Sequence, residues 1–303
     1  MKQFRIYTAV VFSMIFWSVS FIWTRMAIVS FAPVTLISLR LLLASLFLLV
    51  VSVATKRFQK IRKEDFKWFV LLAFFEPYMY YIGETYGLTL VDSTPASVIV
   101  STIPLFAPIL AFFFLKEKMT LANILGIVIS LVGVFFVIYD PDSGFTANPK
   151  GVALLFLAVF SAVLYTTVLR KISTDYHTIN VIFYQSLLGL MFFIPTFFVT
   201  DFSSVGEKEI TLKSVEAVLM LVVFASVIAF VLFAGVVREI GVAKTNVFVN
   251  LIPVFTALFA WWILGEQLTG IKITGIVIVV AGLFVSQINR KRFSFKRIRG
   301  VEY

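Results

Sequence analysis

The sequence predicts an all-α integral membrane protein whose ten transmembrane helices form two inverted five-helix repeats, with both termini in the cytoplasm. Three observations support this fold class. The chain is strongly apolar and falls into helix-length apolar spans, one segment recurs 149 residues later, and the basic residues gather in alternate loops.

The composition excludes an ordinary soluble domain. Of the 303 residues, 60% are hydrophobic and only 14% are charged, whereas about a quarter of a soluble domain is charged. The chain has no cysteine, so disulfides, thiolate metal sites and cysteine nucleophiles are excluded. The single histidine, His177, lies in a short polar loop and is interpreted as a solvated loop residue. No cofactor or metal site is expected.

Ten spans are long enough to cross a bilayer, which requires about 20 apolar residues in a helix. The first continues past Trp17 and Trp23 without a small-x-small cleavage site, so it is interpreted as a retained helix rather than a signal peptide. The expected spans are residues 6–29, 34–55, 66–89, 94–115, 120–139, 150–170, 179–200, 213–237, 244–264 and 268–289.

The basic residues are distributed unevenly between the loops on the two sides. If the N-terminus is inside, 20 of the 26 Lys and Arg residues fall on the inner side. Such asymmetry is typical of cytoplasmic loops. The net charge of +10 is therefore a topology signal and not a nucleic-acid patch. A multi-pass protein of the bacterial inner (plasma) membrane is expected.

An internal repeat divides the chain into two halves. Residues 98–137 and 247–286 are identical at 16 of 40 positions without a gap. The match pairs the fourth and fifth expected helices with the ninth and tenth, so each half has five helices. Because five is an odd number, the second half is inserted in the membrane with the opposite orientation to the first. The expected units are repeat 1 at 1–140, repeat 2 at 150–290, and a basic cytoplasmic tail at 291–303. Inverted repeats of this kind are typical of transporters with a site near the membrane midplane.

Several motifs resemble the drug/metabolite transporter superfamily, EamA type. They are Trp17-Ser18 in the first helix, the run from Pro33 through Arg40 in the second, and the repeated Pro-x-Phe, Leu-x-Glu and Gly-x6-Gly patterns. The resemblance covers residues 6 to about 289. It implies a ten-helix fold, a central cavity, and export or exchange of metabolites or amino acids, but it does not imply one substrate.

Charged side chains inside the spans are candidates for function, because each costs roughly 2.5–3.5 kcal/mol to insert. Glu84 lies about five residues and Arg40 about six residues from the outer ends of their helices, at depths of roughly 8–9 Å. The two are therefore expected to come close together. Either they form a structural contact between helices, or they form a substrate or gating contact on the external side.

Glu76 is expected some 12 Å deeper, near the midplane, from a rise of about 1.5 Å per residue. It precedes Pro77, which can kink the helix, and it shares a polar stripe with Tyr80 and Glu84. Two interpretations are open. Glu76 binds a proton or a cationic group, or it is a neutral hydrogen-bonded residue that orders the kink.

Polar and aromatic residues on other helices are further candidates for the substrate site. Small polar faces also occur simply because membrane helices pack through them, so packing is the alternative interpretation. The candidates are Trp17, Tyr165, Gln185, Asn246 and Asn250.

The paired residues of the repeat are assigned structural roles. Glu117 and Glu266 each precede a threonine by three residues, an arrangement that favours the start of the following helix. Gly126 and Gly275 each have a second glycine seven residues later, which permits close helix contact. Pro104 and Pro253 complete this group.

The leading functional hypothesis is a secondary transporter that moves a small metabolite, such as an amino acid or related compound, by alternating access. Export follows from the family resemblance. The alternative is an uncoupled facilitator or exchanger, and a more remote one is an intramembrane lipid-modifying enzyme or receptor. Expected partners are the substrate, H⁺ and the lipid bilayer. A homodimer is compatible with the sequence, which gives no support for it.

Overall fold

The protein is an assembly of helices, and the computed structural model describes residues 2–115, 119–140, 144–169, 171–172, 175–241 and 245–287. Labels prefixed η mark helical segments with wide (π) or narrow (3-10) turns. The first half contains α1 (Lys2–Ala27), α2 (Pro33–Ala54), α3 (Phe66–Ala73), η1 (Phe74–Met79), α4 (Tyr80–Leu90), α5 (Ser93–Val100), α6 (Ile103–Leu115) and α7 (Leu121–Ile138). The second half contains α8 (Pro149–Leu169), α9 (Thr178–Thr200), η2 (Phe202–Ser204), α10 (Leu212–Met220), η3 (Leu221–Ile228), α11 (Ala229–Ile240), η4 (Asn246–Leu251), α13 (Ile252–Phe259), η5 (Ala260–Leu264) and α14 (Gly270–Gln287).

A short hairpin joins the two halves. Its strands, β1 (Tyr139–Asp140) and β2 (Gly144–Phe145), pair antiparallel. Within the described residues this is the only sheet. The predicted all-α membrane class is therefore confirmed.

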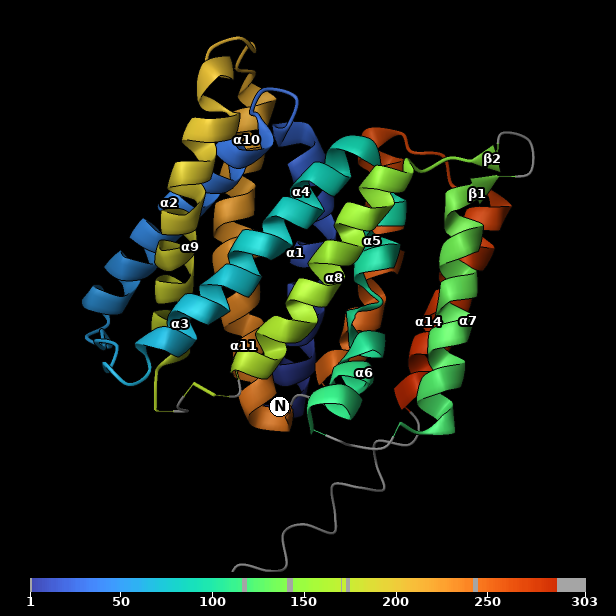
Figure 1. Cartoon of the computed structure of the whole chain (residues 1–303), viewed down its shortest axis with the longest axis horizontal. Helices are drawn as coiled ribbons and strands as arrows, with labels where there is room; N and C mark the ends of the chain where they lie inside the picture. Colours follow the sequence, from blue (N-terminus) through green and yellow to red (C-terminus); the bar gives the residue numbers. More distant parts are fainter. Residues whose placement is uncertain are drawn as a thin grey trace, which may run out of the picture.

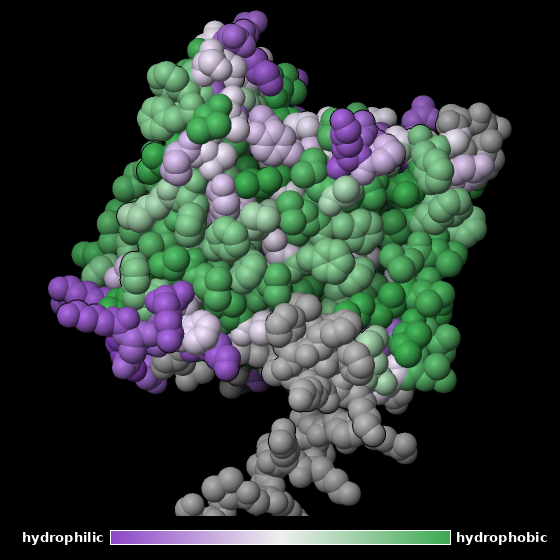
Figure 2. Space-filling view, in the orientation of Figure 1, coloured by the Kyte–Doolittle hydropathy of each residue, from purple (hydrophilic) through white to green (hydrophobic). Residues whose placement is uncertain are grey.

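Eight helical stretches of the described chain are long and apolar enough to cross a membrane. The remaining two expected spans are interrupted. Residues 66–89 are divided between α3, η1 and α4, and residues 94–115 between α5 and α6. Ten crossings, and the cytoplasmic placement of both termini, stay predictions. Figure 2 shows hydrophobic surface across the middle of the face in view, with hydrophilic residues at its two ends.

Two pairs of helices show that the repeats are inverted. Helices α7 and α14 lie side by side (Figure 1). A Cβ added at Gly126 would meet Gly282, and one added at Gly133 would meet Gly275. The start of α7 therefore contacts the end of α14, and the two helices are antiparallel. Because the repeat spacing of 149 residues pairs Gly126 with Gly275 and Gly133 with Gly282, the internal two-fold exchanges these two contacts.

Ser130 marks the position of this two-fold axis. Its hydroxyl donates a 3.2 Å hydrogen bond to the carbonyl of Val279, which is its own repeat equivalent. The two helices also begin alike. Thr120 accepts from the Asn123 amide at 3.2 Å, and Thr269 accepts from the Lys272 amide at 3.4 Å.

Helices α2 and α9 form a second antiparallel pair, nearer the opposite edge of the bundle in Figure 1. Ser52, near the end of α2, donates to Asn180 near the start of α9 at 2.8 Å. Thr35, near the start of α2, donates to Asp201 just after α9 at 3.1 Å. We call the face where α1 begins the N-side. The Ser52–Asn180 contact lies toward the N-side and the Thr35–Asp201 contact toward the opposite side.

Candidate functional site

The third expected span is interrupted at Glu76. Its backbone is extended (φ −144°, ψ 113°) inside the wide-turn segment η1, and Pro77 has no amide hydrogen to continue the helix. The predicted kink is therefore present. The ring of Pro77 packs against α9 of the second half, where a Cβ added at Gly189 would overlap it. The glycine thus lets the two halves approach closely at the break.

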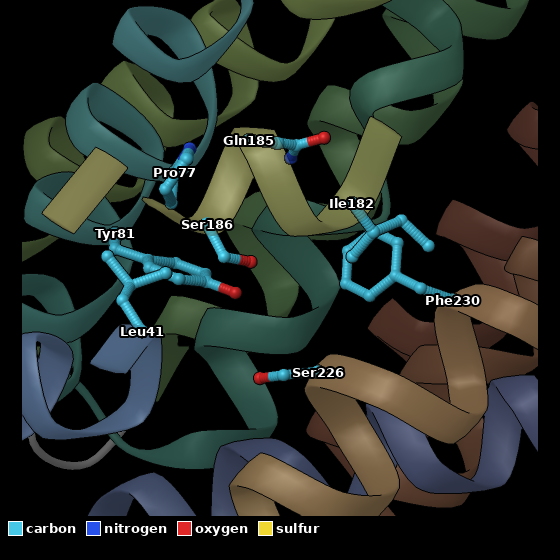
Figure 3. A pocket seen from close by; sticks show the side chains of 8 residues that line it. All are labelled: Leu41, Pro77, Tyr81, Ile182, Gln185, Ser186, Ser226 and Phe230. Atoms are coloured by element: carbon cyan, nitrogen blue, oxygen red, sulfur yellow. The ribbon is translucent and has the colours of Figure 1, made fainter. Parts of the chain in front are cut away.

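A small pocket lies between the two halves beside this break (Figure 3). Helices α2 and α4 and segment η1 form one wall, and α9, η3 and α11 form the other. Figure 3 shows Tyr81 and Ser186 directing their hydroxyls into the same space, with Phe230 across from them. The lining residues are Leu41, Pro77, Tyr81, Ile182, Gln185, Ser186, Ser226 and Phe230.

Arg40 is buried (7% exposed) next to this pocket. Its Nε donates a 2.7 Å hydrogen bond to Ser226, and its guanidinium carbon lies 4.5 Å from the centre of the Tyr81 ring. Arg40 therefore joins α2 of the first half to η3 of the second through a charge-assisted hydrogen bond.

Arg40 and Glu84 do not form a direct ion pair. The ion pairs of the described chain with N–O distances up to 4.0 Å join Arg25 to Asp92 and Arg62 to Asp175. The sequence predicted that Arg40 and Glu84 lie at the same depth in the membrane, but depth alone does not determine the direction in which each side chain points. Arg40 turns to Ser226 and Tyr81, although it remains close enough to interact electrostatically with Glu84.

Four of the predicted site residues form two hydrogen-bonded pairs. Glu84 is buried (6% exposed) and accepts from the Tyr80 hydroxyl at 3.1 Å. The Tyr165 hydroxyl donates to Gln185 at 3.2 Å. Of these four residues, Gln185 lines the pocket.

Glu76 differs from its neighbours in having no hydrogen bond or ion pair with the described residues. Its side chain is half-buried. Arg40 and Glu84 both act on it electrostatically, and it acts in turn on Tyr165. Glu76 itself does not line the pocket, but its neighbour in the chain, Pro77, does.

Trp17 lies behind the pocket wall. Its ring centroid is 5.1 Å from that of Phe230 and 4.9 Å from that of Phe233. Its indole nitrogen donates to the Ala225 carbonyl at 3.3 Å. Trp17 thus supports the aromatic wall from α1.

The asparagine candidates lie elsewhere. Asn250, in η4, is 2% exposed and does not line this pocket. Among the residues that the structure describes, neither its amide nitrogen nor its oxygen has a hydrogen-bond partner, and the structure offers no account of this. The side chain of Asn246, like residue Glu117, lies outside the described residues.

Glu266 caps a distant helix rather than its own. Its carboxylate accepts from the Ser93 amide at 2.7 Å, from the Thr94 amide at 3.0 Å and from the Thr94 hydroxyl at 2.7 Å. These are the first residues of α5, so the connector before α14 holds the start of α5 in the other half. Pro104 and Pro253 are buried in α6 and α13.

On the N-side, a polar network joins the α2–α3 connector to the segment before α9. Gln59 accepts from the His177 amide at 2.6 Å and donates to the Asp175 carbonyl at 3.1 Å. Arg62 pairs with Asp175 at 3.0 Å, and that hydrogen bond raises the pKa of the guanidinium. His177 contacts Arg57 at 3.2 Å, so it takes part in the network and is not merely solvated.

Six lining residues were not expected from the sequence, namely Leu41, Tyr81, Ile182, Ser186, Ser226 and Phe230. One signal could have found Ser226, because the repeat spacing of 149 residues pairs it with Pro77. Shifted by the same spacing, Phe74–Met79 falls inside Leu221–Ile228, so the wide turns η1 and η3 occupy equivalent positions in the two halves. Within the described chain, no three His, Asp or Glu side chains cluster in a way that could hold a metal ion.

Comparisons with known proteins agree with this architecture. The model of the EamA-like transporter family matches the chain twice, at residues 4–139 and 149–287. The uncharacterized transporter YetK of Bacillus subtilis (strain 168) is 28% identical over 265 residues, which cover 86% of this chain and 80% of YetK. An uncharacterized transporter of Archaeoglobus fulgidus is 27% identical over 277 residues, covering 91% of this chain and 96% of that protein.

The fold is also known from experiment. A solved crystal structure superposes with a TM-score of 0.67 at 15% sequence identity, covering 95% of this chain and 98% of that chain. At this identity the likeness shows the fold alone.

Proposed function

Because the chain belongs to the EamA-like transporter family, we propose that it is a secondary transporter that moves a small metabolite by alternating access. One observation supports this most directly. A pocket lined by both inverted halves lies beside Glu76, a carboxylate without a described partner. Inverted repeats of this kind place their binding sites between the halves and alternate by rocking one against the other.

The contacts between α2 and α9 suggest how the halves move. One polar contact joins these helices toward the N-side, at Ser52–Asn180, and another joins them toward the opposite side, at Thr35–Asp201. If one contact opens while the other holds, the pocket is exposed to a single side. Arg40 and Ser226 bridge the halves beside the pocket and act as the contact around which the halves turn.

The orientation and direction of transport are part of the proposal. The N-side carries most of the basic residues, so it faces the cytoplasm of a bacterial inner membrane under the positive-inside rule. The cargo is an amino acid or a related compound, moved outward. The carboxylate of Glu76 binds either a proton or the cargo itself, so the protonation or occupancy of Glu76 is coupled to transport.

Comparative metabolomics of cells that lack or overproduce the protein would identify the cargo. The cargo should accumulate inside the cells that lack the protein. Transport of that cargo would then be measured in proteoliposomes containing wild type, Glu76→Gln or the control Glu209→Gln, whose side chain is exposed in a loop. Loss of transport, or of its pH dependence, in Glu76→Gln alone is expected.

Three outcomes would contradict the proposal. Unchanged transport and unchanged pH dependence in Glu76→Gln would remove this residue from the mechanism. Transport by wild type that persists with a protonophore and shows no pH dependence would favour an uncoupled facilitator. The absence of any cargo whose cellular level depends on the protein would argue against transport itself.

A further inference from the structure

The α2–α3 connector is strongly basic. Between Lys56 and Lys67 the chain has six basic and two acidic residues, a net charge of +4. Figure 2 shows a hydrophilic patch at the lower left, where Figure 1 places this connector on the N-side. The corresponding connector of the second half, residues 201–211, has three acidic residues and one basic residue, a net charge of −2. The fold places a connector here in both halves, so the fold itself does not require the positive charge.

Three lysines of this connector are exposed, and their side chains have no hydrogen bond or ion pair with the described residues. We call them the basic patch: Lys56, Lys60 and Lys63. By contrast, Arg62 in the same connector pairs with Asp175. A lysine ammonium is a compact charge on a flexible stem, so a surface of anionic groups can satisfy it without a fixed geometry.

Lys56 has a backbone conformation that favours glycine. Its φ is 55°, and the amides of Lys56 and Arg57 donate to the carbonyls of Val53 and Ser52 at 3.0 and 2.9 Å. Helices that end with this pair of bonds usually have glycine at the position of Lys56, because a side chain there is strained. A lysine at any nearby position would satisfy the positive-inside rule. Topology alone therefore does not explain a lysine at this position, and strain of this kind points to a use for the side chain.

The connector lies within reach of lipid headgroups. It directly follows α2, which is long and apolar enough to cross the membrane, and it precedes α3. Two apolar side chains lie among its lysines, Phe58 with 40% and Phe66 with 51% of its surface exposed. Lysines interspersed with exposed aromatic side chains are typical of segments that lie on a membrane surface. The position and the aromatic residues favour a lipid partner over a soluble acidic protein.

We propose that the basic patch binds the headgroups of anionic phospholipids of the phosphatidylglycerol type. The connector is also joined to the segment before α9, through Gln59 to His177 and through Arg62 to Asp175. A bound headgroup therefore stabilises the contact between the two halves on the N-side. Lipid binding here requires no cargo, so its test is independent of transport.

Lysine acetylation of the full-length protein in nanodiscs would locate the bound lipid. The discs contain phosphatidylcholine alone or an equal mixture with phosphatidylglycerol. Lys60 and Lys63 should react about fivefold more slowly in the mixture, as expected for roughly fivefold binding per lysine near an anionic surface. Lys150 and Lys213 are the controls, because they are exposed at the starts of α8 and α10 on the opposite side and face the same lipid mixture. Their rates should change much less.

Thermal unfolding in the same two discs tests whether the bound lipid stabilises the protein. Phosphatidylglycerol should raise the midpoint of wild type. This gain should be lost when Lys60→Gln and Lys63→Gln are combined, and retained when Lys150→Gln and Lys213→Gln are combined. Lys56→Gly should unfold at a higher temperature than wild type in phosphatidylcholine, because glycine adopts this conformation without strain, and it should gain less from phosphatidylglycerol.

Equal slowing of acetylation on the two sides of wild type would overturn the proposal, and this comparison remains decisive if a variant does not fold. An equal gain in midpoint for the two double variants would also overturn it. Soluble glycerol 3-phosphate or polyglutamate, added to phosphatidylcholine discs, should not slow acetylation of the basic patch. Slowing as strong as that by phosphatidylglycerol would assign the patch to a free phosphate or to an acidic protein instead.

Discussion

Replacing Glu266 with alanine should destabilise the protein, because the Glu266 carboxylate caps the start of α5, a helix in the other half of the chain. The carboxylate accepts two amide hydrogen bonds and one hydroxyl hydrogen bond at the start of α5. Ser93 and Thr94 are both almost completely buried, so water cannot replace the lost acceptor. Each buried donor left without a partner costs about 1–3 kcal/mol. For the two amides together, we expect a loss of roughly 3 kcal/mol.

Thermal unfolding in a single detergent would measure this loss. A loss of that size should lower the unfolding midpoint by on the order of 5–10 °C. Glu266→Gln retains an amide oxygen that can accept, so its midpoint should fall between those of wild type and Glu266→Ala. Glu209→Ala removes an exposed carboxylate and should change stability by less than about 0.5 kcal/mol. A Glu266→Ala midpoint equal to that of Glu209→Ala would show that the α5 cap does not stabilise the fold.

Two further substitutions test the contact between the halves at the pocket. Gly189→Val would push a side chain into the ring of Pro77, and we expect this overpacking to lower the free energy of unfolding by about 1–3 kcal/mol, measured by thermal unfolding. Gly235→Val is the matched control, because a Cβ added there meets nothing within 4 Å, and it should be tolerated. Equal effects of the two substitutions would refute the close contact. Arg40→Lys keeps the positive charge but loses both the stacking on Tyr81 and the Nε hydrogen bond to Ser226. Transport should therefore fall further in Arg40→Lys than in Ser226→Ala. The reverse order would contradict the bridging role of Arg40.

Much of the scaffold could be predicted from the sequence. Gly126, Gly133, Gly275 and Gly282 match across the repeat because both α7 and α14 need small residues where they touch. The same packing requirement acts on both copies, so the two sequences stay alike. Periodicity and the repeat therefore predicted the helical class, the inversion and these glycines.

The site was harder to predict for a physical reason. It lies on α2, η1, α9 and η3, where the sequences of the two halves differ. For example, Pro77 in the first half has Ser226 as its repeat equivalent in the second. Helix depth indicated the level of Arg40 and Glu84 but not their rotation about the helix axes. Likewise, the spacing of Glu266 from Thr269 indicated a local cap, because sequence spacing reveals only partners within the same segment.

The absence of cysteine from the chain permits a direct test of alternating access without knowledge of the cargo. Ser186→Cys places one thiol in the pocket, and its reaction with a membrane-impermeant maleimide can be measured from either side of oriented vesicles. Cross-linking cysteines at Ser52 and Asn180 would lock one side, and cysteines at Thr35 and Asp201 would lock the other.

Alternating access around this pocket requires that Ser186→Cys react from both sides in the unlocked protein. The Ser52–Asn180 lock should abolish labelling from the N-side alone, and the Thr35–Asp201 lock should abolish labelling from the opposite side alone. Labelling from both sides in either locked protein, or from neither side in the unlocked one, would contradict a pocket that opens to each side in turn.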